Sequence, residues 1–283
     1  MSKPFFGVMK CLQYVLSAIL VLVALYALRL LAHAFLFDVF VIPSNSMLPT
    51  LQPGDRLLVS KVIAGPRLYR SLHIPPTPID LECYRLKGLR QIQIGDVVVF
   101  NAPMHEGRMS FLINHVYAKR CVALPGDTIS IMNGRFVNNN YDGALGLYSE
   151  QARLANIPDS IIDQSVLNTF PYDARFSWTI KYMGPLYVPR KGDRILITPK
   201  EACLYRHILE WETGTNVSCD TITYHTFKHD YYYLCGDNVL NSCDARYWGF
   251  VPEEYIIGVV THITYSINPY TGRLGNERTF KHV

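Results

Sequence analysis

One uncharged apolar run lies near the start of the chain, at residues 11–28, and it is followed by a shorter apolar stretch at 30–37. The run CLQYVLSAILVLVALYAL has 18 residues, which is long enough for a helix that crosses a bilayer. Lys3 and Lys10 precede it, and basic residues at such an end stay on the cytoplasmic side. We therefore predict a cytoplasmic tail over 1–10, a transmembrane anchor in the lipid bilayer over 11–37 and an exported domain over 38–283.

An alternative interpretation of the same stretch is a cleaved signal peptide. Ala32-His33-Ala34 has the A-x-A pattern of a cleavage site. The apolar run is longer than the usual core of a cleaved signal, and Arg29 stands before the site. These features favour an uncleaved anchor, and cleavage at Ala34 stays open as the alternative.

After the anchor, Gly-Asp recurs four times directly before an apolar, β-prone run, in PGDRLLVS, IGDVVVF, PGDTISI and KGDRILI. Gly supplies an unusual φ in a turn and Asp bonds to the nearby backbone, so this pattern is typical of turns that enter strands. The sequence predicts strands that start near Arg56, Val97, Thr128 and Arg194. Asn133-Gly134 predicts a two-residue hairpin turn after the third of them.

One helix is well marked, in TPKEACLYRHILEWETG. Thr198 and Glu201 form a capping-box pattern, Pro199 occupies the first helical position and Gly214 is the stop signal. Residues 140–180 are polar and weakly periodic, so we expect an irregular excursion there. The sequence thus predicts a mainly β domain, in which residues of about 140–230 form an inserted, smaller subdomain.

Charge and cysteine content limit the kinds of partner and metal site that the chain could have. The formal net charge of +4 is spread along the chain without a basic block, so nothing indicates a nucleic-acid partner. The seven cysteines include no CxxC pair, and Cys235 and Cys243 lack the spacing of a metal site. We favour buried, inert thiols, with structural disulfides such as Cys203–Cys219 as the alternative.

Three stretches hold candidate chemistry: PSNSMLPTL at 43–51, YAKRCVALPGD at 117–127 and GDNVLNSCDARYWGFVP at 236–252. A serine hydroxyl such as that of Ser46 needs a base. Lys119 is a candidate only if its amine becomes neutral, because the ordinary lysine pKa of about 10.4 keeps it charged at neutral pH. Burial in an apolar site lowers such a pKa. Taken alone, each stretch is more typical of an ordinary turn, a surface lysine or a polar loop than of a catalytic site.

Together, and in this order after an anchor, the three stretches resemble the serine, lysine and third conserved segments of bacterial type I signal peptidases, or leader peptidases, a Ser-Lys dyad serine protease family. The resemblance implies that Ser46 is the nucleophile and Lys119 the general base. It implies that Ser44 helps to form the oxyanion hole and that Ser242 orients the lysine. Asp244 and Arg246 would form a supporting ion pair, with Asp237 in the same segment. The family uses no metal or cofactor.

The family removes signal peptides from exported preproteins after small residues, at sites of the A-x-A type. The resemblance therefore implies a single-pass enzyme of the plasma (inner) membrane, with its catalytic domain outside and a substrate extended along the strand edge near 39–42. Asn45, Val239, Leu240 and Ala245 depart from the commonest family pattern. The alternatives are another Ser-Lys peptidase, a β-domain that binds signal peptides without cutting them, and a soluble domain freed at Ala34.

Overall fold

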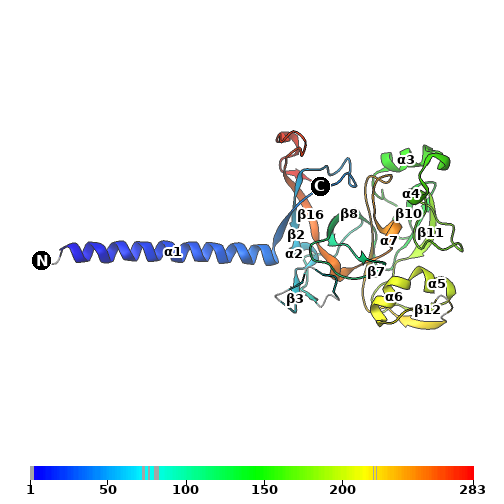
Figure 1. Ribbon diagram of the computed structural model, residues 1–283, viewed down its shortest axis with the longest axis horizontal. Helices are drawn as coiled ribbons and strands as arrows, with labels where there is room; N and C mark the ends of the chain where they lie inside the picture. The colour runs from blue at the N-terminus through cyan, green and yellow to red at the C-terminus, as the bar shows by residue number, and fades with distance from the viewer. Residues whose placement is uncertain (1–2, 72–73, 76, 80–82, 219, 221) are drawn as a thin grey trace.

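A long helix, α1 (Lys3–Phe35), projects from a β-rich body in the computed structural model (Figure 1), which describes residues 3–71, 74, 75, 77–79, 83–218, 220 and 222–283. Residues Leu12–Phe35 of this helix have a mean hydropathy of 2.5, and the body buries none of the most apolar window. Length and composition are sufficient for a membrane span. The helix starts earlier than the predicted anchor and continues past Arg29, and β1 begins at Phe37.

The body is organised around one sheet of eight antiparallel strands. Along the sheet the strands are β1 (Phe37–Val41), β2 (Asp55–Ser60), β16 (Ile256–Ser266), β5 (Val97–Asn101), β8 (Val116–Ala123), β14 (Tyr231–Cys235) and β15 (Val251–Pro252), with β17 (Lys281–His282) beside β16. The long strand β16 lies between β2 and β5 in this order, and β1 lies at one edge of the sheet. The predicted mainly β fold is confirmed.

Smaller elements surround this sheet. A three-stranded sheet contains β10 (Arg135–Asn138), β9 (Thr128–Met132) and β11 (Tyr182–Tyr187). Three two-stranded sheets pair β12 (Arg194–Ile197) with β13 (Thr223–Thr226), β3 (Arg67–Tyr69) with β4 (Cys83–Arg85), and β6 (Met104–His105) with β7 (Arg108–Met109). The short helices are α2 (Lys61–Ala64), α3 (Tyr148–Asn156), α4 (Gln164–Leu167), α5 (Pro199–Leu204), α6 (Arg206–Thr213) and α7 (Ala245–Trp248). Single 3₁₀ turns cover Asp159–Ile161, Glu253–Tyr255 and Asn276–Arg278.

The local signals of the sequence are confirmed at most positions. The four Gly-Asp turns lead into β2, β5, β9 and β12. Asn133 and Gly134 have φ of 49° and 74° between the paired strands β9 and β10, as a two-residue hairpin turn requires. Thr198 and Glu201 form the capping box. The predicted helix ends at Gly214, but Tyr205 divides it into α5 and α6.

The prediction of an irregular segment over 140–180 is wrong for 148–156, which form α3. Only Gln151 and Leu154 of this helix are buried. One polar and one apolar contact residue give no apolar period of 3.6, so the usual helix signal is missing from the sequence.

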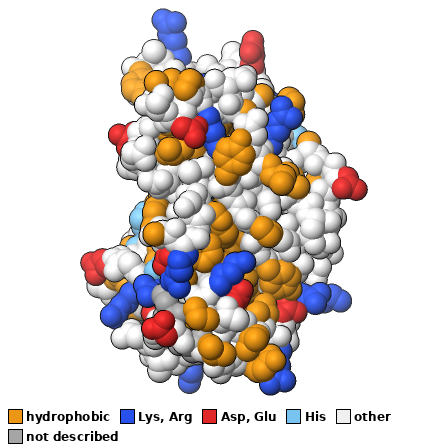
Figure 2. Space-filling view, turned by 90° about the vertical axis from the view of Figure 1, so that its right-hand side faces the viewer, with side chains coloured by type: hydrophobic (Ala, Val, Ile, Leu, Met, Phe, Trp, Pro, Cys, Tyr) orange, Lys and Arg blue, Asp and Glu red, His pale blue; other side chains and the backbone are white. Residues whose placement is uncertain are grey.

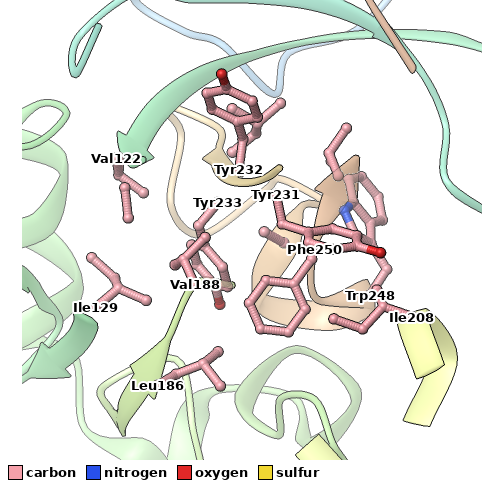
Figure 3. Packing of buried hydrophobic residues seen from close by; sticks show 14 of the residues in the cluster. Val122, Ile129, Leu186, Val188, Ile208, Tyr231, Tyr232, Tyr233, Trp248 and Phe250 are labelled. Atoms are coloured by element: carbon pink, nitrogen blue, oxygen red, sulfur yellow. The ribbon is translucent and has the colours of Figure 1, made fainter. Parts of the chain in front are cut away.

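A single buried cluster joins the large sheet to the elements of 128–230. Figure 3 shows Val122 of β8 facing Ile129 and Leu186 of the small sheet, with Phe250 and Ile208 of α6 packed beyond them. The segment predicted as an inserted subdomain therefore shares its core with the rest of the body.

The surface opposite α1 carries side chains of both charge signs between groups of hydrophobic side chains (Figure 2). Among the cysteines, Cys121 and Cys235 are buried free thiols, as predicted, whereas Cys243 is exposed. Cys219 of the alternative bridge Cys203–Cys219 lies outside the described residues.

Candidate active site

The turn that holds Ser44 and Ser46 connects β1 to β2, and buried apolar side chains of the turn hold it against the body. Ile42, Met47 and Leu51 are buried in one cluster with residues of β2, β5 and β16. This anchoring leaves Ser44 exposed and Ser46 half-buried, with their hydroxyl oxygens 3.3 Å apart. No group of the described chain accepts a hydrogen bond from the Ser46 backbone N–H.

Lys119 enters this site from the middle of β8. Its Nζ donates a hydrogen bond of 2.7 Å to Ser46 Oγ across 73 positions of sequence. The Lys119 side chain is 2% exposed, and this burial lowers its pKa, while Asp244 acts in the opposite direction. Burial thus favours the neutral amine that a general base needs.

Arg120, on the opposite face of β8, ties three segments together. It donates to both carboxylate oxygens of Asp237, at 2.7 and 2.6 Å. Thr50, from the serine turn, donates to the same carboxylate at 2.5 Å. Asp237 is 1% exposed, so this paired charge holds the serine turn and the lysine strand at a fixed spacing.

The segment after Asp237 also contacts the serine turn through its backbone. Asn238 donates from its backbone N–H to the Ser46 carbonyl and from Nδ2 to the Asn45 carbonyl, each at 3.1 Å. These two bonds fix the carbonyl groups on either side of the Ser46 N–H. The direction of that N–H is therefore set by the third segment.

Asp244 and Arg246 form the predicted ion pair in full burial. Two hydrogen bonds of 2.8 Å run from Arg246 Nε and Nη2 to the two oxygens of Asp244. Gly236 N–H donates to Asp244, and Arg246 Nη1 donates to the Val239 carbonyl. Arg246 lowers the pKa of Asp244 against the effect of burial. The pair thus closes the loop between Gly236 and Arg246 on itself.

Ser242 is buried beside the site but does not bond to Lys119 within the described part of the chain. A Cβ on Gly236 would lie 2.1 Å from Ser242 Oγ and 2.6 Å from the Ser46 carbonyl oxygen. Both groups therefore converge on Gly236, and a larger residue at this position would push the third segment away from the serine turn.

A groove leads from the dyad along the free edge of β1. Its volume is about 540 Å³, and it is lined by residues 40–44 on one side and by 113–119 on the other. Within the described sheet β1 pairs only with β2, so its other edge has unpaired backbone groups that face this groove. An extended peptide can pair with such an edge.

Three of the four departures from the family pattern have a structural explanation. Asn45 is not among the residues with positive φ, so the backbone between the serines does not need glycine there. Val239 is buried with Leu154, Ile162, Leu167 and Ile180, and Leu240 packs against them. Through these apolar contacts the third segment packs against residues 148–180, the greater part of the predicted 140–180 excursion, here called the 148–180 excursion.

Sequence reasoning assigned no role to Thr50, Arg120 or Asn238, although all three position the site. Arg120 directly follows the candidate base Lys119, and Asn238 directly follows Asp237. Their position next to a candidate site residue was the one signal in the sequence that could have indicated these two. The described residues include no group of three or more His, Cys, Asp or Glu that would suit a metal ion.

Comparison with known proteins identifies the family. The sequence profile described as "Signal peptidase, peptidase S26" matches residues 12–265. The chain is 28% identical over 285 residues to signal peptidase I of Buchnera aphidicola subsp. Baizongia pistaciae, covering 93% of this chain and 79% of that one. It is 25% identical to signal peptidase I of Helicobacter pylori J99, covering 91% and 82%.

The signal peptidase I of Pseudomonas aeruginosa is 29% identical, with 81% of this chain and 65% of that one covered. A crystal structure of a signal peptidase I from Enterococcus faecalis aligns with a TM-score of 0.31 and 19% identity, over 60% of this chain and 97% of that one. The profile match extends over most of the chain, from the apolar helix to the last long strand. The chain therefore belongs to the signal peptidase family, peptidase S26.

Proposed function

We propose that this chain is a membrane-anchored serine endopeptidase that removes signal peptides from exported preproteins, with Ser46 as nucleophile and Lys119 as general base. The observation that carries this proposal is the 2.7 Å contact between Ser46 Oγ and a lysine amine that is 2% exposed. A buried lysine beside a hydroxyl, at the end of a peptide-sized groove, suits amide hydrolysis without a histidine.

The reaction would begin when neutral Lys119 accepts the Ser46 proton as Oγ attacks the scissile carbonyl carbon. The developing oxyanion would lie between the Ser46 N–H and the Ser44 hydroxyl, whose oxygen is 3.3 Å from Ser46 Oγ. The Lys119 ammonium then gives its proton to the leaving amine, and an ester with Ser46 remains. Lys119 next takes a proton from water as the water oxygen attacks the ester carbonyl carbon. The bond from that carbon to Ser46 Oγ then breaks, Lys119 returns the proton to Oγ, and the acid product leaves.

The surrounding residues would act by position. Asp237, through Arg120 and Thr50, fixes the distance between nucleophile and base. Asp244 and Arg246 fix the loop that sets the direction of the Ser46 N–H. We assign to Ser242, buried next to these groups, the task of orienting the lysine amine during turnover.

The substrate would lie extended in the groove beside β1, with small residues before the cut, as in A-x-A sites. We propose that 1–10 lie in the cytoplasm, that 11–37 cross the plasma (inner) membrane and that 38–283 form the exported catalytic domain, with 140–230 as its inserted part. Since β1 follows α1 directly, the dyad would act close to the outer membrane surface, where a signal peptide ends.

Cleavage of a preprotein with an A-x-A site, in micelles of a nonionic detergent, tests this proposal. Wild type should cut after the second Ala, as N-terminal sequencing of the product would reveal, and Ser46→Ala should leave the preprotein intact. Cleavage by Ser46→Ala would remove Ser46 as nucleophile. Cleavage by neither protein, with both folded, would favour another Ser-Lys specificity or a binding domain.

A further inference from the structure

A second cavity continues the active-site groove toward the end of α1. Its volume is about 400 Å³. Phe40, Ile113 and Val116 line both this cavity and the groove of the dyad, so the two form one path along β1. On β1, Asp38 and Phe40 both turn toward this path, because alternate residues of a strand face the same side.

The second cavity differs from the groove in its charge. Lys61 and Arg67 line it, against a single described carboxylate, that of Asp38. Lys61 Nζ is 3.3 Å from Asp38 Oδ2, and these two side chains are 15% and 19% exposed. The two cations therefore outnumber the one anion in a space that is only partly open to water, where charges are weakly screened.

Arg67 is held in place before any ligand arrives. Its Nη1 donates to Asn101 Oδ1 and to the Glu254 carbonyl, both at 3.0 Å. Asn101 is 1% exposed and donates in turn to the Leu112 and Ile113 carbonyls at 3.0 Å each. The guanidinium is thus a fixed positive charge, which attracts an anion without having to lose side-chain freedom.

The direction of the substrate decides what would reach this cavity. A signal peptide leaves the bilayer and extends to Ser46, and α1 followed by β1 does the same, so substrate and β1 run in parallel. From Ile42 back to Asp38, a strand covers roughly 13 Å at about 3.3 Å per residue. If the small residue three before the cut lies beside Ile42, the cavity takes residues about five to seven before the cut.

We propose that this cavity is an upstream subsite that selects preproteins with an acidic side chain about five to seven residues before the cleavage site. The inference rests on the proposed function and adds a preference that the A-x-A rule does not contain. Lys61 and Arg67 supply the attraction, and Asp38 limits it.

The experiment uses the full chain in nonionic detergent and sets of preproteins that differ at one residue. Positions five, six and seven before the cut carry Glu, Gln or Lys in turn. At one of these positions we expect kcat/KM to be about tenfold higher with Glu than with Lys, and intermediate with Gln. Lys61→Gln should reduce this ratio to about a third, and Asp38→Asn should increase it, since each changes one charge of the subsite.

Lys200→Gln is the matched control, because Lys200 is exposed on α5 in another part of the body. The ratio of kcat/KM with Glu to kcat/KM with Lys should be the same for this variant as for wild type. Equal rates with Glu and Lys at all three positions, or a ratio that Lys61→Gln leaves unchanged, would overturn the subsite. Cleavage of the Gln preproteins shows that the peptidase itself is active, so that equal rates then concern the subsite alone. If the Gln preproteins are not cleaved either, both the proposed function and the subsite fall. A Lys61→Gln effect seen only in vesicles with anionic lipid, and equal for all preproteins, would assign the cavity to a lipid headgroup and overturn the proposal.

Discussion

Two neighbouring residues of β8 carry opposite tasks because a strand turns them to opposite faces. Lys119 is buried against Ser46, where burial lowers the pKa of its amine. Arg120 reaches the carboxylate of Asp237. One position of register thus separates the proposed general base from the side chain that ties the lysine strand to the third segment.

In the proposed mechanism, the pH dependence of cleavage follows from the protonation of Lys119. Burial lowers the pKa of this amine, so the active neutral form increases as pH rises and reaches half at a pH below the ordinary lysine value of about 10.4. We expect kcat/KM to rise with pH through that pKa and then to level off. A profile that is flat from pH 6 to 10 would exclude Lys119 as the titrating base.

The stability of Lys119→Met should differ from wild type in a pH-dependent manner. Below the folded-state pKa, wild type bears the full cost of burying an ammonium; the cost falls as pH rises and vanishes above the unfolded-state pKa of about 10.4. The Met variant should therefore melt at a higher temperature near pH 7, with a smaller difference at pH 10, while its cleavage rate falls by about 10²–10⁴. Ser46→Ala is the control, because it leaves the lysine in place and changes no charge. Its difference in melting temperature from wild type should not depend on pH in this way.

Asp237→Ala should destabilise the body by about 3 kcal/mol, because it leaves Arg120 without its carboxylate in a largely buried position. Urea unfolding measures this change, and cleavage should fall as the serine turn loses the Thr50 contact. Arg190→Ala removes an ion pair from a side chain that is 62% exposed and should cost under about 1 kcal/mol. Equal effects of the two variants would contradict the role of Asp237.

At the scale of elements, the third segment is held from both sides. The serine turn contacts it through Asn238, and the 148–180 excursion packs on it through Val239. Tyr247 donates to the Val166 carbonyl, and the Phe170 N–H donates to the Arg246 carbonyl. The excursion thus acts as a buttress of the active site, although it holds none of the groups assigned to catalysis.

Ile180→Ala tests this buttress. Ile180 is 1% exposed in the cluster that contains Val239, so its truncation should cost about 2–4 kcal/mol and leave a cavity beneath the third segment. We expect kcat to fall at temperatures where the variant is still folded. Ile161→Ala, at a side chain that is 72% exposed, should change neither quantity, and an Ile180→Ala enzyme with full kcat would show that the excursion is unnecessary for the site.

At the scale of the whole molecule, α1 and the body are nearly independent. The body buries no side chain over residues 12–35, and the bond from Lys61 Nζ to the His33 carbonyl is one of few links between them. The core that stabilises the body extends from the large sheet through residues 128–230 instead (Figure 3). The helix therefore places the enzyme, whereas the body folds around its own core.

A chain that begins at residue 36 should consequently keep the fold. We expect its thermal unfolding to occur within a few degrees of the full chain, and its cleavage of a soluble A-x-A peptide to stay within about tenfold, because the dyad and its supports lie outside α1. Only the full chain should sediment with membranes. Loss of the cooperative transition in the shortened chain would show that α1 contributes to the body.

The sequence by itself determined the features that depend on neighbouring residues. The apolar run, the Gly-Asp turns, the Asn133-Gly134 hairpin and the capping box of Thr198 act through bonds and dihedral angles within a few positions. The order of the three candidate segments along the chain was sufficient to indicate the family. The α3 helix was missed, because so few of its residues face the core.

Only the tertiary structure decided which groups meet. Ser46 and Lys119 are 73 positions apart, and the buried face of β8 depends on the strands that pair with it and on the segment that closes over it. The links from Arg120 to Asp237 and from Asn238 to the serine turn, and the charged cavity beside β1, also join distant parts of the chain. Such contacts follow from long-range strand pairing and packing, which local sequence patterns do not encode.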